Sequence, residues 1–334
     1  MTELLPPLVV APMAGGPSNP ALVTAAARAG SVGFLAAGYQ TPEAVEDQVR
    51  ATRVAGVPYG LNIFVPTPAE PDPARVEAYR RLLLPEAQRY GVDLPTPRGH
   101  DDDHFAAKVD LAVAYAVPLV SFAFGVPPAG VVRALRDAGC HVLITVTSAD
   151  EARRAVAAGP DALVAQAGTA GGHASTTDPS GYRPRGEARD LLAAVRSVTD
   201  LPVVVAGGTS SAEDVAGLRA AGAAAVQSGT AFLLADEAGT RPAQRAAMLS
   251  GDFRRTVVTR AFTGHPARAL ANRFTDAYSA AAPVAYPAVH HLTAPIRAAA
   301  ARLGDAEALN LWAGTGFASA VPGPAADIVA RLTG

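Results

Sequence analysis

Two glycine-containing segments near residue 200 have the residue types of an anion site. An apolar run over 201–206 ends at Gly207-Gly208, and a second run over 223–227 ends at Ser228-Gly229-Thr230. Glycines after strands leave backbone N–H groups free to bind an anion, so the matched pair predicts a phosphate site. The alternative is that these glycines only allow tight turns between strands and helices.

Uncharged polar residues stand at other expected strand ends. Asn62 lies near the end of a run over 59–65, and Gln166 ends the run over 162–166. Met13 and Ala14 stand where the first run ends. An amide both donates and accepts hydrogen bonds, which suits the edge of a flavin ring. Together with a phosphate site, these residues predict bound flavin mononucleotide (FMN), although amides at strand ends can also serve only to satisfy buried polar groups.

His173 is the histidine that follows an expected strand beside glycines, in the text GTAGGH. An imidazole can take or give a proton near neutral pH, and the neighbouring glycines allow a close backbone approach. We therefore predict that His173 is catalytic. The alternative is an ordinary loop histidine.

Two further clusters contain residue types that occur in functional sites. The segment from His100 to His104 reads HDDDH, which we interpret as a solvated loop and helix start away from the site rather than a metal centre. Tyr286 and His290 lie in the Pro-punctuated segment YPAVHHLTAP. They could reach the site from above or pack within their own segment, and both interpretations stay open.

Eight short apolar runs, each followed by a helix-forming segment, would position these residues. The runs cover residues 8–13, 32–36, 59–65, 117–123, 142–146, 162–166, 201–206 and 223–227. Near-continuous apolar strands are typical of a parallel sheet covered by helices, and eight such units predict a TIM (β/α)8 barrel. In that fold the functional residues follow the strands.

The alternation of strands and helices stops near Asp236. Residues 237–315 read as helical and loop-rich, without convincing strands, and predict a small helical substrate or lid domain inserted after the eighth strand. The barrel would comprise residues 1–236 and 316–334, with a closing helix over 325–332.

Composition limits the classes of function. The chain of 334 residues has a net charge of −2, so it lacks the basic footprint of a nucleic-acid-binding protein. The uncharged stretches 111–132 and 277–296 are broken by prolines, and the N-terminus does not read as a signal peptide. We expect a cytoplasmic enzyme with a small-molecule substrate, no membrane or nucleic-acid partner, and an oligomeric state that the sequence leaves open.

At these motifs the sequence resembles the class I nitronate monooxygenases, formerly called 2-nitropropane dioxygenases. The matching text is APMAGG (11–16), GFLAAGY (33–39), QAGTAGGH (166–173), AGG and QSGT (within 206–230), FTGHPARALANRF (262–274) and WAGTG (312–316). These motifs span nearly the whole chain in the same order as in the family.

The resemblance implies an FMN-dependent barrel that oxidises alkyl nitronates with O₂ to a carbonyl compound and nitrite. It implies that His173 is the active-site imidazole. The implied FMN contacts are Asn62, Gln166, Gly171, Gly208, Gln227, Ser228, Gly229 and Thr230. To these we add Met13, Ala14 and Gly172 from their positions after expected strands.

The substrate side departs from the family's pattern. Where members read SFHFG this chain reads SFAFG, which places Ala123 at the position of a second active-site histidine. Where members carry two tyrosines and a lysine, it has Tyr286, His290 and Ala294. Two alternatives therefore stay open: an FMN-dependent NAD(P)H reductase of the enoyl-reductase type, and a flavin-binding protein that has lost catalysis.

Overall fold

Eight parallel strands close into a barrel, which confirms the predicted fold class. The computed structural model describes residues 5–66, 71–184 and 186–334. The strands, in barrel order, are β1 (Leu8–Val10), β2 (Val32–Ala36), β3 (Tyr59–Phe64), β4 (Leu119–Ala123), β5 (His141–Val146), β6 (Ala162–Gln166), β8 (Val203–Ala206) and β9 (Ala225–Ser228). Each lies within or beside an apolar run of the sequence, and β9 pairs with β1 to close the barrel.

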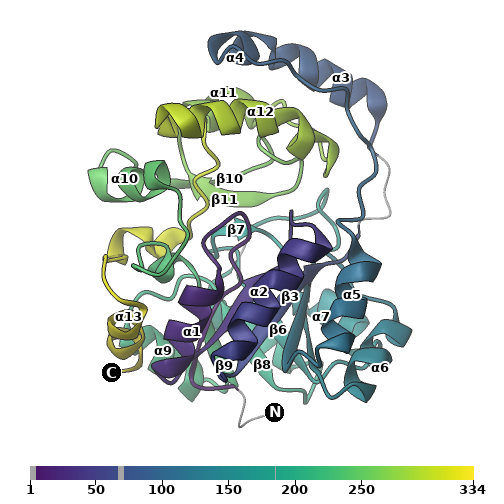
Figure 1. The fold of residues 1–334 in the computed structure, drawn as a ribbon, viewed down its shortest axis with the longest axis vertical. Coiled ribbons are helices and arrows are strands. Elements are labelled where there is room, and N and C mark those ends of the chain that lie inside the picture. Colours follow the sequence, from purple (N-terminus) through teal and green to yellow (C-terminus); the bar gives the residue numbers. More distant parts are fainter. Residues whose placement is uncertain (1–4, 67–70, 185) are drawn as a thin grey trace.

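Helices surround the barrel on its outer side (Figure 1). They are α1 (Pro20–Arg28), α2 (Pro42–Val54), α5 (Phe105–Ala114), α6 (Ala129–Asp137), α7 (Ala149–Val156), α8 (Ala188–Arg196), α9 (Ala212–Ala220) and α13 (Ala325–Thr333). Asn19 and Thr41 cap α1 and α2, since their side chains accept hydrogen bonds from the first turns of these helices. Ser211 and Asp214 form a capping box at the start of α9.

Apolar side chains fill the barrel interior. Val9, Phe34, Leu119 and Val164 belong to one buried cluster contributed by different strands. Alternate residues of the same strands face outward and pack against the surrounding helices in two larger clusters. The filled interior leaves the carboxyl ends of the strands, hereafter the mouth, as the place for a site.

A second group of elements covers the mouth and includes a small antiparallel sheet (Figure 1). Its strands, in the order β10 (Thr256–Thr259), β11 (Ala267–Leu270) and β7 (Gly172–His173), join the segment after the barrel to the loop after β6. The expectation that residues 237–315 contain no strands is therefore wrong. The two strands there have only four residues each, and β11 contains an arginine, so neither forms an apolar run.

Helices from both halves of the chain complete this group, which we call the small domain. They are α10 (Pro242–Ser250), α11 (Arg273–Tyr278), α12 (Ala288–Leu303), α3 (Pro73–Leu82) and α4 (Leu84–Arg89), with a short 3₁₀ turn at Ala306–Ala308. Two further 3₁₀ turns, at Thr230–Phe232 and Thr315–Ser319, lie at the mouth of the barrel. Although α3 and α4 follow a barrel strand, they share a core with α12, and the Tyr79 hydroxyl donates to the Ala261 carbonyl at 2.8 Å. The domain boundaries drawn from the sequence stay predictions.

No helix in the described part of the chain is both long and apolar enough to cross a membrane. Cys140, the single cysteine of the chain, is buried just before β5.

Candidate active site

A pocket of about 330 Å³ lies between the mouth of the barrel and the small domain. It brings together fourteen of the fifteen residues that the sequence analysis selected: Met13, Ala14, Asn62, Ala123, Gln166, Gly171, Gly172, His173, Gly208, Gln227, Ser228, Gly229, Thr230 and His290. Tyr286 is not among the lining residues. Its ring centroid lies 5.6 Å from that of Phe124 and 6.3 Å from that of His173, two residues that do line the pocket.

The loop after β8 has unused hydrogen-bonding groups. Gly207 and Gly208 have positive φ angles of 121° and 73°, a conformation that glycine adopts without strain. The Thr169 hydroxyl lies beside both glycines and Thr209 lines the pocket, and neither buried hydroxyl has a hydrogen-bond partner among the described residues. Buried donors without partners are costly, so this loop is built to receive an acceptor.

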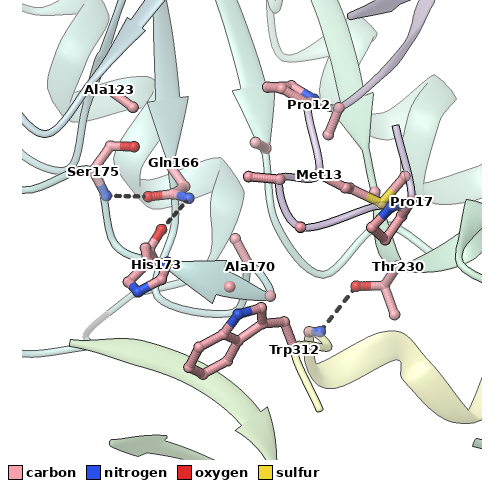
Figure 2. A pocket seen from close by; sticks show the side chains of 18 of the residues that line it. Pro12, Met13, Pro17, Ala123, Gln166, Ala170, His173, Ser175, Thr230 and Trp312 are labelled. Carbon is pink, nitrogen blue, oxygen red and sulfur yellow. Dashed lines mark hydrogen bonds between the residues drawn. The ribbon is translucent and has the colours of Figure 1, made fainter. Parts of the chain in front are cut away.

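The loop after β9 contributes the other side of this region, which we call the cradle. A Cβ added to Gly229 would lie 3.2 Å from the Ala11 Cβ and 3.5 Å from the Met13 sulfur, so a larger side chain there would enter the pocket wall. The Thr230 hydroxyl accepts from the Gly314 N–H at 2.9 Å (Figure 2). A Cβ on Gly171 would approach the Gly314 nitrogen to 2.5 Å. The loop after β6, which contains Gly171, and the segment that contains Gly314 are therefore in direct backbone contact.

The two amide side chains are held in different ways. The Asn62 amide nitrogen donates to the Ser121 hydroxyl at 2.9 Å, which leaves its oxygen available toward the pocket. The Gln166 nitrogen donates to the His173 carbonyl at 3.0 Å, and its oxygen accepts from the Ser175 N–H at 2.7 Å (Figure 2). Gln166 therefore fixes the loop that carries His173, besides lining the pocket.

His173 lies in an enclosed aromatic environment. Its ring centroid is 5.0 Å from that of Trp312 and 5.5 Å from that of Phe124. Burial, with added repulsion from His265 and Arg297, holds the pKa of His173 well below its usual value. The imidazole is therefore neutral at physiological pH and can accept a proton.

The tautomer of His173 follows from its neighbours. Its Nε2 lies 2.9 Å from the Thr263 hydroxyl, and that hydroxyl is within 3.3 Å of the His265 carbonyl, to which it can donate. When Thr263 donates to that carbonyl, its oxygen accepts the proton of Nε2 and Nδ1 carries the free lone pair. In this tautomer Nδ1 is the basic atom of His173.

Residues of the small domain supply the wall opposite the barrel. The His290 ring stacks on the Tyr39 ring, with centroids 4.4 Å apart and an angle of 4° between the planes. Arg297, about two turns of α12 further on, reaches back to the His290 carbonyl at 2.9 Å. Burial is the largest cause of the strongly lowered pKa of His290, so this imidazole is also neutral.

The acidic loop lies close to the pocket, which corrects the expectation that it is remote. Asp103 accepts from the backbone N–H of Tyr39 at 3.0 Å, and the His291 Nε2 lies 3.0 Å from an Asp101 oxygen. The chain passes this point because it must return from α4 in the small domain to α5 on the barrel. Within residues 5–66, 71–184 and 186–334, no group of three potential metal-binding side chains comes together.

Several pocket residues were not selected from the sequence. They are Tyr39, Phe64, Phe124, Arg241, Gln244, Thr263, Arg297, Asn310 and Trp312. Tyr39, Thr263 and Trp312 fall inside motifs that the sequence shares with its family, but no role attaches to them from spacing alone. Arg241 and Arg297 stand at or within helices of ordinary composition, so the sequence offers no local signal for them.

Comparison with known proteins identifies the family. The model of the nitronate monooxygenase family matches residues 1–334. A probable nitronate monooxygenase of Staphylococcus aureus (strain MSSA476) is 32% identical over 331 residues, covering 98% of this chain and 93% of the relative.

Solved structures agree with this match. A nitroalkane oxidase from Streptomyces ansochromogenes is 44% identical with a TM-score of 0.93, covering 99% of this chain and 96% of that one. FabK from Thermotoga maritima is 24% identical with a TM-score of 0.73, covering 99% and 93%, and this likeness concerns the fold alone. With its full length matched by the family model, the chain belongs to the nitronate monooxygenase family of oxidoreductases.

Proposed function

We propose that this enzyme uses bound FMN and O₂ to oxidise small alkyl nitronates to a carbonyl compound and nitrite. The observation that carries the proposal is the presence in one pocket of an anion cradle and a neutral histidine. The family is flavin-dependent in general, and the Streptomyces protein at 44% identity is named as an oxidase of nitroalkanes, a related class of compound.

The cradle fits the phosphate of FMN. The unpartnered hydroxyl of Thr209, which lines the pocket, can donate to phosphate oxygens, as can the backbone N–H groups of the glycine loops. Gly229 keeps this volume free of side-chain atoms. Gly208, Gly229 and Thr230 would hold the phosphate, whereas Met13, Ala14, Asn62 and Gln227 would lie along the rest of the cofactor.

His173 would act as the general base that removes a proton from the substrate. When bound, FMN accepts electrons from the substrate and passes them to O₂. The lone pair of His173 Nδ1 can take a proton from the carbon next to a nitro group, which converts a neutral nitroalkane into its nitronate. Thr263 and the Gln166-bound backbone keep the ring oriented while Nδ1 changes its protonation.

An assay of nitrite release tests the proposal together with its cofactor site. We expect the purified protein to carry FMN and to release nitrite from a short primary nitronate while O₂ is consumed. Gly229→Asp should lose both FMN and nitrite release, because the substitution puts bulk and a negative charge where the phosphate binds. Gly130→Asp, at the exposed start of α6 with nothing within 4 Å of an added Cβ, is the matched control.

Two results would overturn this function. Flavin-loaded wild-type protein that releases no nitrite from any small nitronate would exclude the activity. Full FMN retention in Gly229→Asp would exclude the cradle as the phosphate site. The NAD(P)H-reductase alternative is not favoured by the likeness to FabK, because that likeness concerns the fold alone.

A further inference from the structure

Arg297 brings a positive charge into the pocket without an acidic partner. Its Nε donates to the Thr293 hydroxyl at 3.1 Å and its Nη2 donates to the His290 carbonyl at 2.9 Å. Both acceptors are neutral and lie on the same helix, α12. Across the described ranges, no carboxylate lies within ion-pair distance of Arg297, and Nη1 has no hydrogen-bond acceptor.

The surroundings make this charge costly. Burial lowers the pKa of Arg297 to about 10, and repulsion from Arg241 acts in the same direction. An enclosed charge without a counter-charge is unfavourable, whereas an anionic ligand in the pocket would compensate it. The free Nη1 donors and the missing counter-charge therefore point to the same kind of ligand.

The neighbouring histidines cannot supply this charge themselves. Burial and the field of Arg297 hold the pKa values of His290 and His173 well below the usual histidine value. The His290 Nδ1 lies 3.4 Å from Arg297 Nη2, where a neutral imidazole can accept from the guanidinium. Both histidines are therefore neutral when the guanidinium carries its charge.

The barrel side of the same region has no donor at the end of β4. Ala123 lines the pocket there and packs with Phe64 and Phe124, with Tyr39 and Tyr286 at the edge of the cluster. An alanine side chain forms no hydrogen bond, so an anionic substrate group needs its donor from another element. Arg297 lines the same pocket from α12 and retains two N–H donors for that purpose.

We propose that Arg297 binds the negatively charged oxygens of the substrate through Nη1 and thereby selects a small planar oxyanion. That the oxyanion is a nitronate rests on the proposed function. The anion site itself rests on the geometry of Arg297. Such a site favours a charged nitronate over the corresponding neutral nitroalkane, because the guanidinium–oxyanion bond is stronger than a bond to an uncharged nitro group.

Binding of inorganic nitrate to the flavin-loaded protein tests the site without catalysis. Nitrate is planar, carries one negative charge and cannot be oxidised further, and bound FMN keeps it out of the cradle. We expect nitrate to bind the wild type, measured by calorimetry at pH 7, and Arg297→Gln to weaken the binding about 10-fold to 100-fold. Arg297→Lys, which keeps the charge, should lose less. Arg302→Gln, an exposed arginine on the same helix, should bind nitrate as the wild type does.

The pH dependence separates the guanidinium from the histidines even if Arg297→Gln fails to fold. A site based on Arg297 retains nitrate affinity from pH 6 to 9, because the guanidinium stays charged below its pKa of about 10. A site based on a protonated histidine loses affinity steeply over the same range, and that result would overturn the proposal. Equal nitrate affinity of Arg297→Gln and the wild type would also overturn it.

Kinetics distinguish failure of this inference from failure of the proposed function. We expect Arg297→Gln to raise KM for a nitronate about 10-fold or more and to change KM for the neutral nitroalkane little. If no nitronate is oxidised but nitrate still binds through Arg297, the proposed nitronate oxidation is wrong, whereas the anion site at Arg297 is supported. If Arg297→Gln oxidises nitronates with an unchanged KM, the proposed anion site at Arg297 is wrong, whereas nitronate oxidation by this enzyme is supported.

Discussion

At the scale of single residues, the properties of His173 come from its neighbours rather than from its sequence position. Thr263 fixes one ring nitrogen, Gln166 holds the backbone carbonyl, and the aromatic wall keeps the imidazole neutral. A basic nitrogen that remains unprotonated at neutral pH is what proton removal next to a nitro group requires. Sequence spacing could select His173, but it could not give the tautomer, which depends on Thr263, ninety residues later.

His173→Asn should separate binding from chemistry. We expect the variant to fold and retain FMN, because the cradle lies at other strand ends, and to turn over a nitroalkane about 100-fold more slowly or worse. His141→Asn, at the opposite end of β5 and outside the pocket lining, is the control. Unchanged turnover in His173→Asn, measured by nitrite release, would show that His173 is not catalytic and has only a structural role.

At the scale of elements, the sequence predicts best where local patterns agree. The apolar runs, the N-cap residues and the glycines after strands all indicate βα units, and the eight barrel strands lie within or beside the predicted runs. β10 and β11 were missed because their stability comes from pairing with each other and with β7, a contact between distant segments. The association of α3 and α4 with α12 is likewise set by tertiary packing.

A buried ion pair holds the loop that carries Tyr39. Lys108 on α5 is fully buried, its Nζ lies 2.8 Å from an Asp103 oxygen, and the other oxygen accepts from the Tyr39 N–H. Lys108→Met should therefore lower the free energy of unfolding by about 3 kcal/mol or more, because it leaves a buried carboxylate without its counter-ion. Adding Asp103→Asn should recover much of that loss, since the amide oxygen can still accept from Tyr39.

Urea denaturation measures both effects against an exposed pair. Arg153 and Asp150 on α7 form an ion pair with side chains 59% and 78% exposed, and Arg153→Met should cost less than about 1 kcal/mol. If Lys108→Met is as stable as the wild type, or if the double variant is no more stable than Lys108→Met, the ion pair does not hold this loop.

At the scale of the whole molecule, the small domain provides the residues that the barrel rule does not predict. In a (β/α)8 barrel the residues that follow the strands lie at the mouth, and this rule alone places the cradle and His173 there. Arg297, Trp312 and Tyr39 enter the pocket only because distant segments fold over it. Tyr286, which was predicted from its place in the same segment as His290, packs beside Phe124 and His173 but does not itself line the pocket.

The buried histidines predict acid sensitivity of the whole fold. His173, His265 and His290 have lowered pKa values caused chiefly by burial, and that of His265 falls to about 4. The unfolded chain takes up these protons near pH 6.5 and the folded protein does not. Stability is therefore fully present above pH 6.5 and is lost as the pH falls toward 4, by about 3 kcal/mol for His265 alone.

Chemical denaturation between pH 8 and 4.5 checks this dependence. We expect a flat free energy of unfolding above pH 7 and a decline below 6.5 that precedes the titration of ordinary carboxylates. His265→Asn should be less stable at pH 7.5, because it loses the bond to the Ala174 carbonyl, but should show a shallower decline. A decline of equal steepness in this variant would mean that His265 is protonated in the folded protein.

Anaerobic mixing of the flavin-loaded protein with a short primary nitronate tests the central claim, that this pocket oxidises nitronates through FMN. We expect the visible absorbance of the oxidised flavin to disappear with the nitronate, to persist with NADH or NADPH, and to return when O₂ is admitted. Bleaching by a nicotinamide but not by the nitronate would contradict the claim and favour the reductase. A flavin that responds to neither would contradict it and indicate a protein that binds FMN without catalysis.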